Sequence, residues 1–104
     1  MKTCIVEVDS SGRFIRVEED FARRLGYKSE TLIGSHFMDL VHAPLRSQII
    51  SIYLNAIKTN NRSVEIDTKL VCKDGSFVEI RAIPYFNVND NGYVTSVTKV
   101  FFKE

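Results

Sequence analysis

The sequence predicts an α+β domain, with one longer helix and several short helices on one face of a five-stranded antiparallel sheet. Two β-rich segments flank the turn signal DSSG near the N-terminus, short helical segments follow, and from residue 62 onward apolar and polar residues alternate. The chain has 104 residues, of which 44% are hydrophobic and 26% charged, so it has room for a single core. We therefore expect residues 1–104 to form one domain.

The first two predicted strands are TCIVEV (3–8) and RFIRV (13–17), which together read as a hairpin. The next segment, EEDFARRLG (18–26), has acidic residues where a helix would begin and basic residues where it would end. Phe21 and Leu25 lie four residues apart and share one face of this helix. A short helix is therefore expected directly after the hairpin.

Two glycines divide the stretch that follows into short pieces. Gly26 is expected to end the first helix in the left-handed conformation, and Ser29 can then cap a second, very short helix. Gly34 ends that helix, and HFMDLV (36–41) is a further helical or turn-like piece. A longer helix is predicted over about residues 44–59, beginning at Pro44 and stopped by the asparagine pair at 60–61.

Three more strands are predicted at 64–72, 76–88 and 93–102, joined by the turns KDG (73–75) and NDNG (89–92). Pro84 indicates an edge-like or bulged part of the long middle strand. The alternation of side chains predicts which of them face the helices. These inward residues are Ile66, Thr68, Leu70, Val78, Ile80 and Ala82.

Charge and apolar segment length argue against several classes of protein. Fourteen basic and thirteen acidic residues leave a formal net charge of +1, so a nucleic-acid binder is not expected. No apolar stretch approaches the roughly 18 residues that span a bilayer, so no membrane contact is expected, and the N-terminus turns polar too soon for a secretory signal. Cys4 and Cys72 match no metal or redox spacing. Two reduced thiols are the simpler interpretation, and a disulfide between neighbouring strands stays open.

The sequence contains no recognisable catalytic set. Ser35 and His36 are adjacent, which is not in itself an arrangement of nucleophile and base. There is also no glycine-rich loop that would bind a phosphate. An enzyme is therefore not expected.

The order of the turn and glycine motifs resembles that of a PAS domain, a sensory and dimerisation module, over essentially all 104 residues. In the second half, the turn at Asp74-Gly75, the long strand with a late proline and a second glycine turn also resemble the family. The matching motifs in the first half are Asp9 with Gly12, Leu25-Gly26-Tyr27, Leu32-Ile33-Gly34 and Asp39-Leu40-Val41-His42.

The resemblance implies a cytoplasmic signal-transduction protein in which the domain regulates an attached output domain, such as a kinase or a cyclic-dinucleotide enzyme. The chain departs from the family pattern at Glu18, where asparagine is common, and at its end, Phe102-Lys103-Glu104, where Asp-Ile-Thr is common. We therefore expect a domain from a longer sensor protein. Because PAS domains share a fold and differ in task, the ligand must be inferred from individual residues.

No cofactor is predicted. Haem-binding relatives carry a histidine on the long helix, but residues 45–59 include no His, Cys or Met, and His36 and His42 read as structural residues. Flavin photoreceptors of the family need a cysteine that HFMDLV lacks. The positions of the amides that would read a non-covalent flavin are held by Leu70, Val78 and Phe101, which offer no side-chain hydrogen bond. Haem and flavin are therefore not expected.

The predicted interior is apolar, and two interpretations stay open: a filled core, or a cavity for a small apolar ligand such as a fatty acid. A polar metabolite would need convergent polar groups, for which Thr68, Tyr53 and Arg81 are candidates, although alternation places Arg81 on the outer face. The predicted pocket residues are Phe21, Leu25, Leu32, Phe37, Leu40, Ile49, Tyr53, Ile66, Thr68, Leu70, Val78, Ile80 and Phe101.

The outer face of the sheet is the predicted interaction surface, formed by Phe77, Ile83 and Tyr85, which Val100 and Phe102 are expected to join. Apolar side chains of this size suggest a covered surface. A homodimer through the sheet is expected, and packing against another segment of the parent chain is the alternative. A ligand-free adaptor that only dimerises is the main rival to a ligand sensor.

Overall fold

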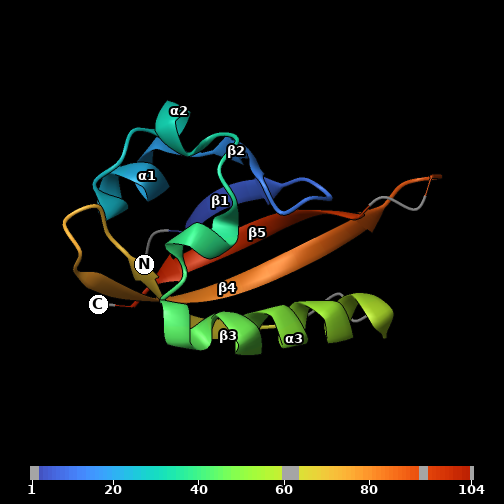
Figure 1. The fold of residues 1–104 in the computed structure, drawn as a ribbon. Helices are drawn as coiled ribbons and strands as arrows, with labels where there is room; N and C mark the ends of the chain where they lie inside the picture. The colour runs from blue at the N-terminus through green and yellow to red at the C-terminus, as the bar shows by residue number, and fades with distance from the viewer. Residues whose placement is uncertain (1–2, 60–63, 92–93, 104) are drawn as a thin grey trace.

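Five antiparallel strands in the order β2-β1-β5-β4-β3 form the only sheet in the part of the chain that the computed structural model describes, residues 3–59, 64–91 and 94–103. The first and last strands therefore pair at the centre of the sheet, and both chain ends lie at the same end of the molecule (Figure 1). The strands are β1 (Thr3–Val8), β2 (Phe14–Val17), β3 (Ile66–Val71), β4 (Phe77–Val88) and β5 (Val94–Phe102).

The helices follow β2 and precede β3, and they pack on one face of the sheet (Figure 1). They are α1 (Glu19–Leu25), α2 (Ser29–Leu32), the 3-10 turns η1 (Phe37–Leu40) and η2 (Ala43–Leu45), and α3 (Arg46–Lys58). Among the described residues, no helix is both long enough and apolar enough to cross a membrane. The predicted α+β architecture is confirmed.

Several predicted boundaries change in the structure. The helix expected over 44–59 is divided, because Pro44 lies in η2 and α3 begins only at Arg46. The strand expected over 64–72 is shorter, because pairing with β4 runs only from Ile66 to Val71. Pro84 follows the end of that pairing, and among the described residues β4 pairs there with β5 alone, so Pro84 lies in an edge-like segment. The predicted stop at 60–61 and part of the predicted turn at 89–92 lie outside the described residues.

Of the two predicted helix caps, Gly26 is confirmed and Ser29 is wrong. Gly26 ends α1 with φ of 87°, the left-handed conformation that was predicted. Ser29 does not cap α2, because Lys28 occupies the cap position and Ser29 is the first helical residue. The Ser29 hydroxyl instead donates a hydrogen bond of 2.7 Å to Glu19 Oε2 and thereby ties α2 to α1.

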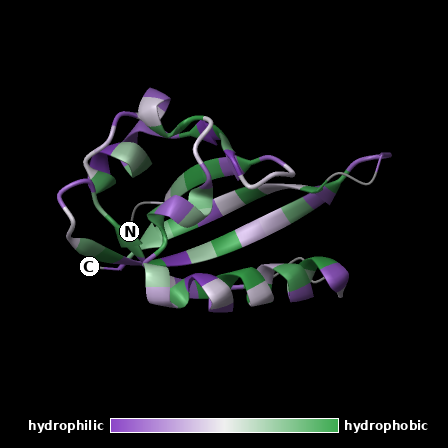
Figure 2. Ribbon diagram, in the orientation of Figure 1, coloured by the Kyte–Doolittle hydropathy of each residue, from purple (hydrophilic) through white to green (hydrophobic). Residues whose placement is uncertain are grey.

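The register of β5 corrects the predicted faces of its last residues. Phe102 pairs with Ile80 and Val100 pairs with Ala82, so both point into the core and are almost fully buried. Phe101 pairs with Arg81 and shares the outer face with it. Val100 and Phe102 were therefore wrong as outer-face residues, and Phe101 was wrong as an inward one. Apolar and polar segments along the strands are visible in Figure 2.

Cys4 and Cys72 are not joined in a disulfide, as the simpler interpretation predicted. Cys4 is buried on β1 near the centre of the sheet, and Cys72 follows β3 at its edge. No cis peptide bond occurs in the described residues.

Candidate functional site: a core cavity and an adjoining groove

A small cavity of about 60 Å³ lies between the inner face of the sheet and the helices. Typical ligand pockets measure roughly 300–1,000 Å³, so this space on its own is far too small for a metabolite. The interior is therefore closer to the filled core than to the open cavity, the two alternatives that the sequence left open. The cavity is lined by Val6, Val8, Phe14, Phe21, Phe37, Leu40, Val41, Ile49, Tyr53, Ile66, Thr68, Leu70, Ile80, Ala82, Thr98 and Val100.

Most of the predicted pocket residues do line this cavity, and four do not. Leu25 and Leu32 are buried elsewhere in the core, and Val78 is partly buried against it. Phe101 lies on the opposite face of the sheet. The predicted residues that line the cavity are Phe21, Phe37, Leu40, Ile49, Tyr53, Ile66, Thr68, Leu70 and Ile80. Their role as ligand contacts stays a prediction.

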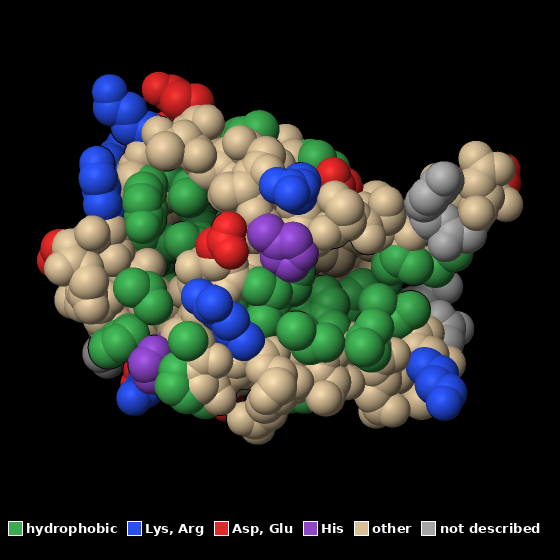
Figure 3. All heavy atoms as spheres, viewed as in Figure 1, with side chains coloured by type: hydrophobic (Ala, Val, Ile, Leu, Met, Phe, Trp, Pro, Cys, Tyr) green, Lys and Arg blue, Asp and Glu red, His purple; other side chains and the backbone are tan. Residues whose placement is uncertain are grey.

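A larger space of about 330 Å³ lies beside the cavity as an open groove. Helix α3 forms one wall, and the turn between β1 and β2, the start of η1, and the β4–β5 hairpin form the rest. Figure 3 shows the hydrophobic surface that runs along this side of the molecule above α3. The groove is lined by Val8, Asp9, Ser10, Ser11, Gly12, His36, Phe37, Met38, Ile50, Tyr53, Leu54, Ile57, Phe86, Val94, Thr95 and Ser96.

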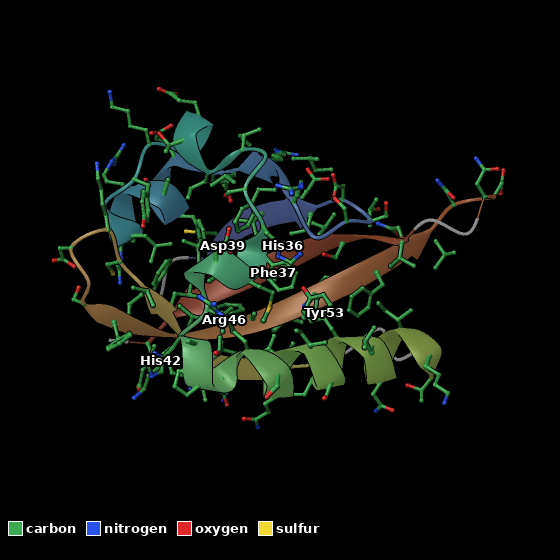
Figure 4. All side chains as sticks on the ribbon, viewed as in Figure 1. His36, Phe37, Asp39, His42, Arg46 and Tyr53 are labelled. Atoms are coloured by element: carbon green, nitrogen blue, oxygen red, sulfur yellow. The ribbon has the colours of Figure 1, made fainter. Side chains whose placement is uncertain are left out.

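Tyr53 separates the groove from the cavity. It projects from α3 toward η1 (Figure 4), and its ring lies 5.2 Å from Phe37, at 30° to it, and 5.2 Å from Phe86, nearly perpendicular to it. Tyr53, Phe37 and Val8 line both spaces.

His36 fixes the position of η1 at the groove wall. Its Nδ1 accepts a hydrogen bond of 3.1 Å from the Met38 backbone N–H, which caps the turn, and its ring stacks on Phe37 at 5.2 Å. The Phe37 N–H donates to the carbonyl of Gly12, so the turn between β1 and β2 holds the same segment from the other side. The expectation that His36 is structural is consistent with these contacts.

The turn between β1 and β2 is organised by Asp9. One carboxylate oxygen, Oδ1, accepts hydrogen bonds from the Ser11 hydroxyl and backbone N–H, at 2.7 and 2.9 Å, and from the Arg13 N–H at 3.0 Å. The Ser11 hydroxyl bond, followed by the backbone bond from Arg13, holds the pKa of Asp9 below its usual value. These bonds turn the chain so that Gly12 meets the His36 ring.

Three hydroxyls on the inner face of the sheet are buried without a hydrogen-bond partner: those of Thr68, Ser96 and Thr98. Burial raises the pKa of Tyr53, while the nearby hydroxyls of Thr98 and Ser96 lower it. No hydrogen bond of normal length and angle satisfies either of those two hydroxyls, although they lie close to the phenol. Since buried polar groups are almost always paired, three buried hydroxyls without a well-formed hydrogen bond are unusual for a protein interior.

The residues around these spaces do not fit haem or a flavin. The sequence of α3 contains no His, Cys or Met that could ligate iron, and the core space of about 60 Å³ cannot hold a macrocycle or a three-ring system. Within the described ranges, no group of three or more His, Cys, Asp and Glu residues could hold a metal ion.

Sequence reasoning did not identify the groove. Two signals were available: Ser96 and Thr98 lie two apart on the last strand and so share one face of it, and α3 has apolar residues on two adjacent stripes. The second stripe, Ile50, Leu54 and Ile57, is 45%, 63% and 36% exposed, so it is not needed to cover the core. Neither signal shows which residues lie opposite the hydroxyls or the apolar stripe, because that depends on the tertiary fold.

Comparisons with known proteins agree with this architecture. A family model described as the PAS fold matches residues 14–101. A PAS domain from Colwellia psychrerythraea is 20% identical, with a TM-score of 0.86 over 97% of this chain and 86% of that one. The N-terminal domain of a diguanylate cyclase with a PAS/PAC sensor, from Marinobacter aquaeolei, is 15% identical, with a TM-score of 0.81 over 97% of this chain and 94% of that one.

A third similar structure is the PAS-B domain of Drosophila melanogaster Cycle with bound ethylene glycol. It is 13% identical, with a TM-score of 0.82 over 96% of this chain and 99% of that one. At these identities the structural matches demonstrate the fold alone. The sequence has no significant match among curated proteins.

Proposed function

We propose that this chain, which belongs to the PAS family, is a sensory module of a cytoplasmic signalling protein and has no catalytic activity of its own. In this proposal it binds a small molecule and passes the signal to an output domain of the parent protein. The diguanylate cyclase among the similar structures carries a PAS/PAC sensor, which is one precedent for such an output. The observation that most favours a ligand is the set of buried, unpartnered hydroxyls beside a groove of about 330 Å³.

Native mass spectrometry of the protein purified from cells tests the sensory function. We expect either a mass excess from a retained small molecule, or a rise in the melting temperature with members of a panel of lipids and metabolites. An unmodified mass together with a melting temperature that no compound moves would contradict the proposal. An absorbance spectrum recorded in parallel would overturn the exclusion of haem and flavin if it showed a visible band.

A second candidate function, dimerisation without a ligand, is favoured by the outer face of the sheet. Tyr85 is 41% exposed there, and Ile83 and Phe101 are partly exposed beside it. No helix covers this face in the described residues (Figure 1). A formal net charge of +1 means that two copies would meet without strong repulsion. We propose a second copy of the chain as the occupant of this face.

Charged residues border the apolar part of the outer face. Asp67 Oδ1 pairs with Arg81 at 3.0 Å and with Lys103 at 2.9 Å, and these bonds, that of Arg81 first, lower the pKa of Asp67 to about 2. The Lys99 ammonium lies 5.6 Å from the centre of the Tyr85 ring. The apolar centre of the proposed interface would therefore be surrounded by a polar rim, as is usual for interfaces between proteins.

Tyr85→Glu is expected to weaken the homodimer by at least about tenfold, because two introduced carboxylates would face each other across the interface. The molar mass, measured by light scattering over a series of protein concentrations, gives the dissociation constant of the dimer. The matched control is Ile33→Glu, since Ile33 is 45% exposed at the end of α2, away from the sheet. A dimer that withstands both Tyr85→Glu and Phe101→Glu would show that the sheet is not the interface.

A further inference from the structure

We infer that the groove between α3 and the β4–β5 hairpin binds an uncharged amphipathic molecule, whose polar end reaches the buried hydroxyls of Ser96 and Thr98. This inference rests on the proposed sensory function and specifies where the ligand lies and which chemical class it belongs to. It moves the site from the core, where the sequence placed it, to the groove beside the core.

The volumes favour the groove. The core cavity offers about 60 Å³, while the groove offers about 330 Å³, which reaches the range of small-molecule sites. The two spaces meet at Tyr53, so a ligand in the groove lies next to the deepest polar groups of the protein.

The buried hydroxyls define the polar end of the ligand. Ser96 is only 4% exposed and Thr98 only 5%, and neither hydroxyl makes a hydrogen bond of normal length and angle, although both lie near the Tyr53 phenol. Both lie on the inward face of β5 close to the Tyr53 hydroxyl, and Ser96 lines the groove directly. A hydroxyl or carbonyl group at this point would satisfy groups that the protein leaves unpaired, which is where a ligand gains most specificity.

The groove walls define the rest of the ligand. Ile50, Leu54 and Ile57 present an exposed apolar stripe of α3, and Phe86 faces it from β4. Such a surface favours an alkyl or aromatic portion of the ligand.

The charges near the groove argue against an anion. Among the described lining residues there is no lysine or arginine, and the one carboxylate is that of Asp9. A carboxylate that is buried without a positive charge beside it is strongly unfavourable. A neutral alcohol or carbonyl compound therefore fits better than the fatty acid that the apolar composition suggested.

Hexan-1-ol and hexanoate test the class of ligand, because they share a chain and differ in charge. In ¹H–¹⁵N NMR titrations we expect hexan-1-ol to shift the amides of residues 50–57 and 94–98, and hexanoate to bind at least about tenfold more weakly. Equal binding of the two compounds, or shifts outside the groove, would overturn the inference.

Two sets of variants test the residues. The double variant Ser96→Ala/Thr98→Val is expected to bind hexan-1-ol about three- to tenfold more weakly, while its melting temperature without ligand stays the same or rises, because unsatisfied buried groups have been removed. Thr3→Val removes a hydroxyl from the exposed end of β1 and should change neither property. Unchanged hexan-1-ol affinity in a folded double variant would refute the role of the hydroxyls.

Leu54→Glu provides a test that does not alter the core, since Leu54 is 63% exposed at the groove wall. We expect it to abolish hexan-1-ol shifts without changing the spectrum elsewhere, whereas Asn55→Glu, outside the groove lining, should leave binding intact. Binding that persists in Leu54→Glu would overturn the groove assignment. If the protein retains a natural ligand in native mass spectrometry and yet ignores hexan-1-ol, this inference fails and the sensory function stands.

Discussion

Phe21→Ala is expected to lower the free energy of unfolding by about 3–5 kcal/mol, the largest effect that we predict for a single substitution. Phe21 is only 2% exposed, and its ring centre lies 6.3 Å from that of Phe14 and 6.0 Å from that of Phe102. It therefore joins α1 to the edge strand β2 and to the central strand β5. A domain of this size has a total stability of roughly 5–15 kcal/mol, so the variant is expected to lose a large part of it.

Urea denaturation followed by circular dichroism measures this loss. Phe77→Ala is the matched control, because it removes the same side chain at a position that is 54% exposed, and we expect it to lower the free energy by less than about 1 kcal/mol. Benzene should partly restore the melting temperature of Phe21→Ala if a dry cavity is left behind. A loss for Phe21→Ala no greater than that for Phe77→Ala would show that the core is loosely packed around α1.

Local signals in the sequence explain why the fold could be predicted. Gly26 has positive φ and ends a helix whose last turn carries two arginines, and Gly75 has positive φ in the turn KDG. The period-two pattern of β3 identifies its buried face. These features depend on residues close together in the chain. The order of the strands in the sheet, in contrast, was not predicted, because it depends on which distant segments of the chain pair.

The end of β5 shows where such reasoning fails. Val100, Phe101 and Phe102 are consecutive apolar residues, so alternation cannot say which of them face inward. Pairing with β4 determines which of them face the core, since Ile80 is buried and Phe102 lies opposite it. A shift of one residue in a strand reverses both faces, and this reversal accounts for the three wrong assignments.

The groove is even harder to predict from the sequence than the faces of β5. Its walls come from the turn after β1, η1, α3 and the β4–β5 hairpin, which are far apart in the chain. The absence of partners for Ser96 and Thr98 is likewise a property of the packed structure, since either hydroxyl could have bonded to a neighbouring backbone group. Sequence alone identifies such residues as polar, and the ambiguity of one residue in β5 leaves even their face undecided.

Gly12→Ala is expected to lower the free energy of unfolding by about 2–4 kcal/mol, because two unfavourable effects combine. Gly12 has φ of +86°, a conformation that side chains disfavour, and a Cβ atom there would clash with His36 Nε2. Gly34→Ala separates the two effects, since Gly34 has φ of +88° and an added Cβ would meet no atom within 4 Å. We expect that control to lose only about 1–2 kcal/mol.

The difference between the two glycine variants measures how firmly His36 holds η1. Displacing the His36 ring would break the hydrogen bond from the Met38 N–H to Nδ1 and the stacking on Phe37. Both Met38 and Phe37 line the groove. In a His36→Ala background the clash is gone, so Gly12→Ala should lower the free energy of unfolding by no more than Gly34→Ala does. Faster hydrogen exchange at the Met38 amide in Gly12→Ala would report the same displacement. If Gly12→Ala lowers the free energy of unfolding equally with and without His36, backbone strain alone is responsible. The turn after β1 would then not position the groove wall through this histidine.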